Sequence, residues 1–175
     1  DGGSRPAVAV GLIDLDRFKE VNNFLGHEAG DAILKSWAAR MQARLHPAEF
    51  LARMGGDEFV LVLEGAAADD SVALNGVLQR LGRSMDDPFE VSGELISLTM
   101  SAGVACSPRD GIEMRTLLRA ADAALHVAKA RGGRTQGWGE LAGPEAGAGA
   151  VDMMRTIKRA LDPKNIMNPG KIFTW

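Results

Sequence analysis

The 175-residue sequence is poor in cysteine, has no excess of basic charge and contains no long apolar run. Its one cysteine, Cys106, cannot form a disulfide within the chain, which favours a reducing cytoplasmic compartment. The net charge is −3, so no basic field favours nucleic acid or an anionic membrane as a partner. Because no apolar run is long enough to cross a bilayer and no signal peptide is visible, we expect no membrane contact from this segment.

The rest of the composition is that of an ordinary globular protein. Apolar residues make up 46% and charged residues 25%, and the length suits one compact domain with its own core plus an appendage. Short apolar runs alternate along the chain with segments whose apolar residues recur at helical spacing. This alternation predicts an α/β or α+β sandwich in which helices cover a sheet.

Strands are predicted where apolar residues run together or alternate with polar ones. Residues 7–13 form an unbroken apolar run, which is typical of a buried strand. Runs at 50–54 and 59–63 flank Gly55-Gly56-Asp57, whose turn chemistry predicts a β-hairpin. In residues 95–106, apolar and polar side chains alternate, which predicts a strand with one wet face.

Helices are predicted between and after these strands. The first helical segment follows Asp16, and the second begins at Asp31. The third runs from Val72 to Met85, and the fourth runs from Leu117 to Ala130. Asp31 would open its helix as a plausible N-cap.

The C-terminal part differs in composition from the rest. Residues 137–150 are rich in Gly and Ala without a period and are predicted to be a linker. Beyond them, Met153 to Leu161 predicts a short amphipathic helix that Pro163 ends. We therefore divide the chain into a domain at 1–136, the linker, and a helical tail at 151–175.

Carboxylates gather at two places that a sheet could bring together. Asp14 and Asp16 lie where the first strand leaves the core, and Asp57 and Glu58 lie in or beside the hairpin turn. If the two segments are neighbours, three or four carboxylates converge, and Mg²⁺ prefers one or two carboxylates with waters and phosphate oxygens. Aspartates at strand ends are also common turn and cap residues, so spacing alone leaves both possibilities open.

Other polar residues have two possible roles as well. The Gly55-Gly56 pair could supply positive φ to a hairpin or let the backbone approach a phosphate. Lys19 could neutralise a phosphate or be a solvated helix lysine. Asn22 and Asp31 together match the hydrogen-bonding pattern of guanine, although each could be a capping residue.

Taken together, these residues resemble the GGDEF family of diguanylate cyclases. The resemblance begins with Asp-Leu-Asp-Arg-Phe-Lys-Glu-Val-Asn-Asn at 14–23 and Gly-His-Glu-Ala-Gly-Asp at 26–31. It continues with Arg-Met-Gly-Gly-Asp-Glu-Phe at 53–59, Ser-Ala-Gly-Val-Ala at 101–105 and the helical stretch at 120–129. Several ordered motifs at the family's spacing are specific, unlike a lone glycine-rich loop.

The resemblance implies a palm-like nucleotidyl-cyclase sheet flanked by helices. The implied reaction condenses two GTP molecules into cyclic di-GMP and pyrophosphate within a homodimer of half-sites, with Mg²⁺ or Mn²⁺ as cofactor. Asp14, the carbonyl of Leu15, Asp57 and Glu58 would hold the metal. Asp57, Glu58 and Lys19 would be catalytic. The residues that would bind GTP are Phe18, Asn22, His27, Asp31, Gly55, Gly56, Lys129 and Arg134.

The sequence departs from the family pattern before the hairpin. The family's product-inhibition motif, Arg-x-x-Asp, is replaced by His46-Pro47-Ala48-Glu49, so the arginine fork for a phosphate or guanine is missing. We therefore expect no tight product inhibition there. The sequence also opens directly on the first strand, without the family's preceding helical segment, which leaves the activity of this segment alone in question.

The tail has a resemblance of its own. Residues 151–173 are similar to the C-terminal segment of FAD-linked oxidases of the D-lactate dehydrogenase type. Since that family's flavin-binding body is absent from the sequence, we expect no flavin. Two alternatives to a cyclase follow: a GGDEF module that senses GTP or cyclic di-GMP without turnover, and, more remotely, a fragment of a flavin-linked oxidoreductase.

Overall fold

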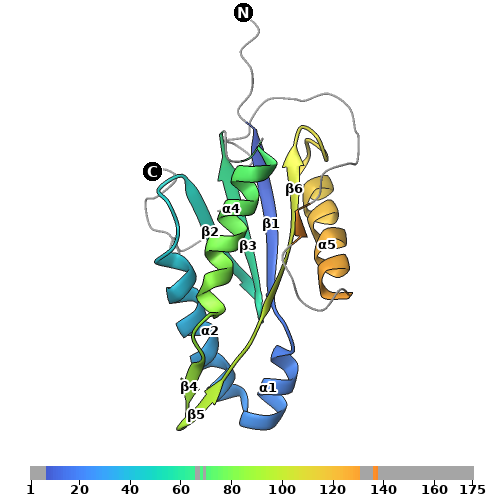
Figure 1. Cartoon of the computed structure of the whole chain (residues 1–175). Helices are drawn as coiled ribbons and strands as arrows, with labels where there is room; N and C mark the ends of the chain where they lie inside the picture. Colours follow the sequence, from blue (N-terminus) through green and yellow to red (C-terminus); the bar gives the residue numbers. More distant parts are fainter. Residues whose placement is uncertain (1–6, 66–67, 69, 131–135, 138–175) are drawn as a thin grey trace, which may run out of the picture.

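The computed structural model describes residues 7–65, 68, 70–130 and 136–137 (Figure 1). Arg134, most of the predicted linker and the predicted tail helix lie outside these residues. The described helices and strands are β1 (Val8–Leu15), α1 (Phe18–Leu25), α2 (His27–Gln42), β2 (Glu49–Gly55), β3 (Glu58–Glu64), α4 (Ser71–Gly82), the 3₁₀ turn η1 (Arg83–Met85), β4 (Phe89–Val91), β5 (Glu94–Ile96), β6 (Met100–Ser107), α5 (Met114–Ala130) and β7 (Gln136–Gly137).

The main sheet has five strands in the order β2-β3-β1-β6-β7. The first strand, β1, lies between β3 and β6 and is antiparallel to both, whereas β7 is parallel to β6. A separate two-stranded sheet is formed by β4 and β5. The predicted α+β class, a sheet flanked by helices, is confirmed.

Alternate residues of β1 enter two different cores, as the two-residue repeat of a strand requires. Ala9 and Ile13 pack in the core that contains buried residues of α2 and α4. Val8 and Val10 pack in a second core with Leu117 of α5. The sheet is therefore covered by α2 and α4 on one face and by α5 on the other.

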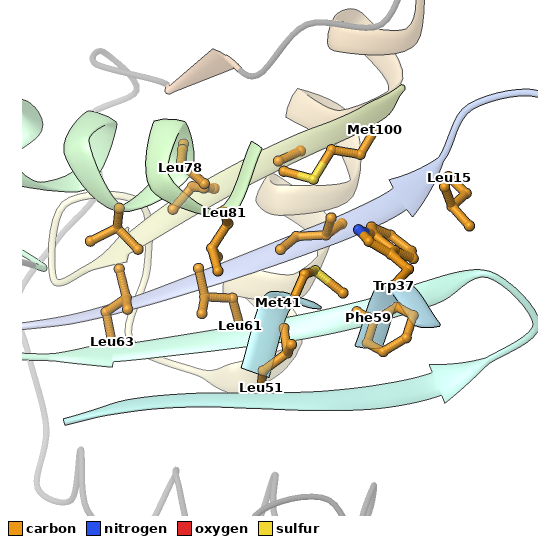
Figure 2. Packing of buried hydrophobic residues seen from close by; sticks show 14 of the residues in the cluster. Leu15, Trp37, Met41, Leu51, Phe59, Leu61, Leu63, Leu78, Leu81 and Met100 are labelled. Carbon is orange, nitrogen blue, oxygen red and sulfur yellow. The ribbon is translucent and has the colours of Figure 1, made fainter. Parts of the chain in front are cut away.

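Trp37 of α2 is fully buried in the larger core (Figure 2). Its ring meets Phe59 of β3 edge-on, with centroids 4.9 Å apart and planes at 71°. Such an aromatic pair adds about 0.5–1.5 kcal/mol beyond its area burial. The indole Nε1 donates to Ser84 Oγ at 3.1 Å, so the one polar atom of this buried ring has a partner. This contact ties α2 to η1.

The helix α5 lies unusually close to the sheet at Gly103 of β6. An ideal Cβ on this glycine would lie 2.1 Å from the backbone N of Leu125 and 2.2 Å from the carbonyl oxygen of Ala121. Only a residue without a side chain fits here. This close contact fixes the position of α5 along β6, and therefore where its last turn ends.

Two sequence predictions about local structure are wrong. The alternating stretch 95–106 is not one strand, because β5 ends at Ile96 and β6 begins at Met100. Asp31 is not an N-cap, since α2 begins at His27 after Gly26. The predicted hairpin is confirmed as β2 and β3. No helix among the described residues has the length and apolarity needed to span a membrane.

Candidate functional site

The end of β1 and the hairpin turn lie side by side in the sheet. Asp14 is the cross-strand partner of Glu58 in β3 and of Ser101 in β6. Asp57 lies in the turn immediately before Glu58 and is half-buried. Directly opposed residues of antiparallel strands present their side chains on the same face. The ladder therefore places Asp14 beside Glu58 and the hairpin turn, a pairing that spacing in the sequence had left open.

Asp14 has an unusual environment for a carboxylate. It is only 5% exposed, and its Oδ2 lies 2.7 Å from the ammonium Nζ of Lys129 in the last turn of α5. Its Oδ1 is buried and has no hydrogen-bond partner within the described part of the chain. Burial raises the pKa of Asp14 to about 6; the hydrogen bond from Lys129 lowers it, while the charges of Asp57 and Glu58 raise it.

Asp14 is expected to make the folded protein less stable as pH rises. A raised pKa means that the folded state binds a proton more tightly than the unfolded state, so stability falls between the ordinary value of 3.8 and about 6. The loss is at most about 3 kcal/mol. In urea titrations across this range, the stability of the wild type should fall relative to that of Asp14→Asn; parallel curves would contradict the assignment.

Asp16 does not join this group. Its carboxylate accepts hydrogen bonds of 2.6 Å from the hydroxyls of Thr99 and Ser101. In the described ranges, no three His, Cys, Asp or Glu side chains are grouped closely enough to hold a metal by themselves. The expected convergence of three or four carboxylates close enough to hold a metal by themselves is therefore wrong: Asp16 bonds to β6 and the segment before it, and Asp14, Asp57 and Glu58 interact without forming such a cluster.

The remaining acids still suit a divalent cation. Mg²⁺ is commonly bound by one or two carboxylates and completes its shell with substrate phosphates and water. Asp14 is a carboxylate whose Oδ1 has no donor among the described residues and whose Oδ2 meets the partly exposed ammonium of Lys129, and two further acids raise the negative charge around it. The main chain of Leu15 ends β1 beside them. This donor set fits Mg²⁺ bound together with a nucleotide.

The helices α1 and α2 bring together most of the residues predicted to bind the base. Asn22 of α1 packs on Gly30 of α2, where an ideal Cβ would lie 1.9 Å from the Asn22 Oδ1. That oxygen is buried and has no hydrogen-bond partner among the described residues. His27 and Asp31 are exposed on α2. The structure thus places an amide and a carboxylate on two adjoining helices.

The start of α1 and the hairpin turn contribute backbone groups. Arg17, before α1, has φ 61°, a left-handed conformation that costs a non-glycine residue about 1 kcal/mol or more. Phe18 is buried in the core, so its side chain is not open to a ligand, whereas Lys19 is exposed. Gly55 and Gly56 are exposed, and a Cβ at either would meet no atom within 4 Å.

A groove that the sequence analysis missed opens beside Glu58. It has a volume of about 440 Å³ and lies between the hairpin and α5. Leu12 and Leu118 contribute apolar surface, and Arg119 and Asp122 contribute charge. Arg119 and Asp122 lie on α5, far from the hairpin in the sequence. Their positions in the sequence therefore did not indicate that they line a groove with Glu58.

The departure from the product-inhibition motif has a structural counterpart. Glu49, at the start of β2, is buried and forms a two-pronged ion pair with Arg80 of α4. The same guanidinium lies 3.2 Å from Nε2 of the exposed His46. Arg80 is therefore engaged within the domain, and the absence of tight product binding stays a prediction.

Comparisons with known proteins agree with this fold. The family description "Diguanylate cyclase, GGDEF domain" matches residues 3–135, and "FAD linked oxidases, C-terminal domain" matches residues 140–172. The diguanylate cyclase TpbB of Pseudomonas aeruginosa is 39% identical over 133 residues, which are 74% of this chain and 30% of that protein. The chain belongs to the GGDEF domain family.

A second relative and a solved structure add to this comparison. The cyclic di-GMP phosphodiesterase NbdA of Pseudomonas aeruginosa is 37% identical over 125 residues, which are 71% of this chain and 16% of that protein. The crystal structure of the TpbB GGDEF domain superposes with a TM-score of 0.71 at 34% identity, covering 77% of this chain and 84% of that one. The chain thus spans less than a third of either full-length relative.

Proposed function

We propose that this domain binds magnesium–GTP and, paired with a second copy, condenses two GTP molecules into cyclic di-GMP and pyrophosphate. The observation that carries the proposal is the meeting of Asp14 with the hairpin acids. Asp14 faces Glu58 across the β1–β3 ladder, and the charges of Asp57 and Glu58 act on it. The match to TpbB, named as a diguanylate cyclase, supports the same reaction.

In this proposal the acids hold the cation and the glycines admit the phosphates. Asp14, the carbonyl of Leu15, Asp57 and Glu58 hold Mg²⁺, which when bound neutralises charge on the triphosphate. The Gly55-Gly56 backbone has no side chain to keep a phosphate away. The start of α1 adds backbone N–H groups and the positive end of a helix dipole.

Asn22, His27 and Asp31 are proposed to bind the guanine between α1 and α2. An amide oxygen and a carboxylate can both accept from the N1–H and N2–H groups of guanine. The Oδ1 of Asn22 has no donor among the described residues; because it is buried against Gly30, the side chain would turn outward to accept one from a base edge. His27, exposed at the start of α2, would line this pocket.

The chemistry is an in-line phosphoryl transfer that occurs twice. The 3′-oxygen of one GTP attacks the α-phosphorus of the other, its proton passes to Asp57, and the bond from that phosphorus to pyrophosphate breaks. Lys19 and Lys129 neutralise negative charge on the phosphates. Catalysis therefore depends on positioning and charge neutralisation, and each domain supplies one half of the site.

A second candidate function is nucleotide binding without turnover. The observation that favours it is the 37% identity to NbdA, which is named as a phosphodiesterase rather than a cyclase. A domain of this kind would sense GTP or cyclic di-GMP within a larger signalling protein.

Chromatography of nucleotides after incubation with GTP and Mg²⁺ separates the two functions. The chain alone and a version fused to a dimerising coiled coil should be compared at equal concentration. We expect cyclic di-GMP mainly from the dimerised form, because one domain holds only one of the two GTP molecules. GTP binding without product in either form would favour the sensing function.

A further inference from the structure

The C-terminal turn of α5 places a lysine ammonium directly on the proposed metal ligand. Lys129 Nζ lies 2.7 Å from Asp14 Oδ2, within charge-assisted hydrogen-bond distance. The side chain of Lys129 is 42% exposed, whereas that of Asp14 is 6% exposed. The ammonium therefore lies on the solvent side of a carboxylate that is otherwise enclosed.

The two oxygens of Asp14 are not equally accessible. Oδ1 is shut off from solvent, and Oδ2 is the oxygen that meets Lys129. A cation that approaches the carboxylate from solvent consequently meets the ammonium first. Two cations cannot occupy such a small space without strong repulsion.

We propose that Lys129 is the resident counter-ion of Asp14, and that it exchanges this carboxylate for a phosphate when metal and nucleotide bind together. The inference rests on the function proposed above. Before binding, the ammonium neutralises Asp14. After binding, the divalent cation neutralises Asp14, and the ammonium neutralises a phosphate oxygen of the nucleotide.

The fold provides the means for this exchange. The close contact at Gly103 holds α5 against β6 at Ala121 and Leu125, one turn before Lys129. The lysine side chain is a flexible four-carbon stem that ends in a compact charge. Its exposed fraction leaves room for the ammonium to swing outward while the helix stays in place.

The exchange makes metal and nucleotide binding mutually dependent. Metal alone must displace the ammonium from Asp14 and leaves it without an anionic partner. Metal that arrives with a triphosphate gives the ammonium a new partner. Because thermodynamic coupling is reciprocal, each ligand should raise the affinity for the other.

Replacing Lys129 by methionine tests the proposal with two binding measurements. Mn²⁺ binding without nucleotide is followed by loss of the free-ion electron paramagnetic resonance signal. We expect K129M to bind Mn²⁺ about tenfold more tightly than the wild type, since the competing charge is gone. We expect the same variant to bind an α,β-methylene analogue of GTP with Mn²⁺ about tenfold more weakly.

Matched variants assign the effect to this pair. K35M removes an exposed lysine from α2 and should leave both affinities unchanged. The double variant Asp14→Asn with Lys129→Met should lose the gain in Mn²⁺ affinity, and K129R should keep the wild-type pattern. Melting temperatures near that of the wild type show that each variant is folded.

The outcomes separate this inference from the proposed function. If the wild type and K129M bind Mn²⁺ with equal affinity, the counter-ion role is overturned, whether or not the GTP analogue binds. A gain in Mn²⁺ affinity that persists in the double variant also overturns it. If the GTP analogue binds to no variant while K129M gains Mn²⁺ affinity, the nucleotide function falls but the counter-ion role of Lys129 at Asp14 stands.

Discussion

Replacing Asp57 by alanine is expected to lower the rate of cyclic di-GMP formation by about 10³-fold or more without lowering the melting temperature. The residue lies in the turn of the β2–β3 hairpin, where its charge acts on Asp14. Its removal takes away a proposed metal ligand and the proposed proton acceptor for the 3′-hydroxyl. The turn itself is built by the neighbouring glycines, so the hairpin should persist. Steady-state release of pyrophosphate in the dimerised protein measures the effect.

A suitable control for this variant is Glu94→Ala. Glu94 is an exposed acid at the start of β5, in the separate two-stranded sheet. Removing it lowers the number of negative charges equally but leaves the proposed metal site intact, so turnover should be unchanged. If Asp57→Ala retained turnover comparable to that of Glu94→Ala, both roles given to Asp57 would be refuted.

Introducing valine at Gly103 is expected to lower the free energy of unfolding by about 3 kcal/mol or more, and the melting temperature by roughly 10 °C. The nearest atoms to an added Cβ are backbone atoms of α5, which cannot turn aside as a side chain can. The helix must therefore move away from β6. Thermal and urea unfolding followed by circular dichroism measure the loss.

Gly76→Ala is the control for Gly103→Val. Gly76 is exposed within α4, and an ideal Cβ there meets no atom within 4 Å. Alanine in a helix is favoured over glycine by about 0.5–1 kcal/mol, so this variant should be slightly more stable. Equal effects of the two substitutions would show that α5 does not pack on β6 as described.

Much of the central fold could be predicted because its signals are local. The apolar run at 7–13 and the two runs around Gly55-Gly56 became β1 and the β2–β3 hairpin. Amphipathic spacing located α4 and α5. The family resemblance implied that Asp14 and the hairpin acids share one metal site, but the pairing of β1 with β3 that sets Asp14 opposite Glu58 is seen only in the structure.

The features that sequence reasoning missed depend on tertiary contacts. The apolar and polar side chains alternate through Ile96, Leu98 and Met100 without interruption, although β5 ends and β6 begins within this stretch. Periodicity alone does not reveal such a break. Ser92 and Gly93, both with positive φ, make the turn between β4 and β5, and this Ser-Gly pair was a usable signal. No sequence signal indicated the contact of Lys129 with Asp14, since the two residues lie near opposite ends of the domain in the sequence.

The antiparallel ladder between β1 and β3 has a consequence for how this domain tolerates insertions. The separation of Asp14 from Glu58 is set by rungs of main-chain hydrogen bonds, not by the length of the chain that connects them. Extra residues in the exposed loop between α2 and β2 would lengthen the path between the two acids without parting them. A one-residue shift in the register of β1 and β3 would separate the two acids without changing the chain length, because Glu58 would then point to the other side of the sheet.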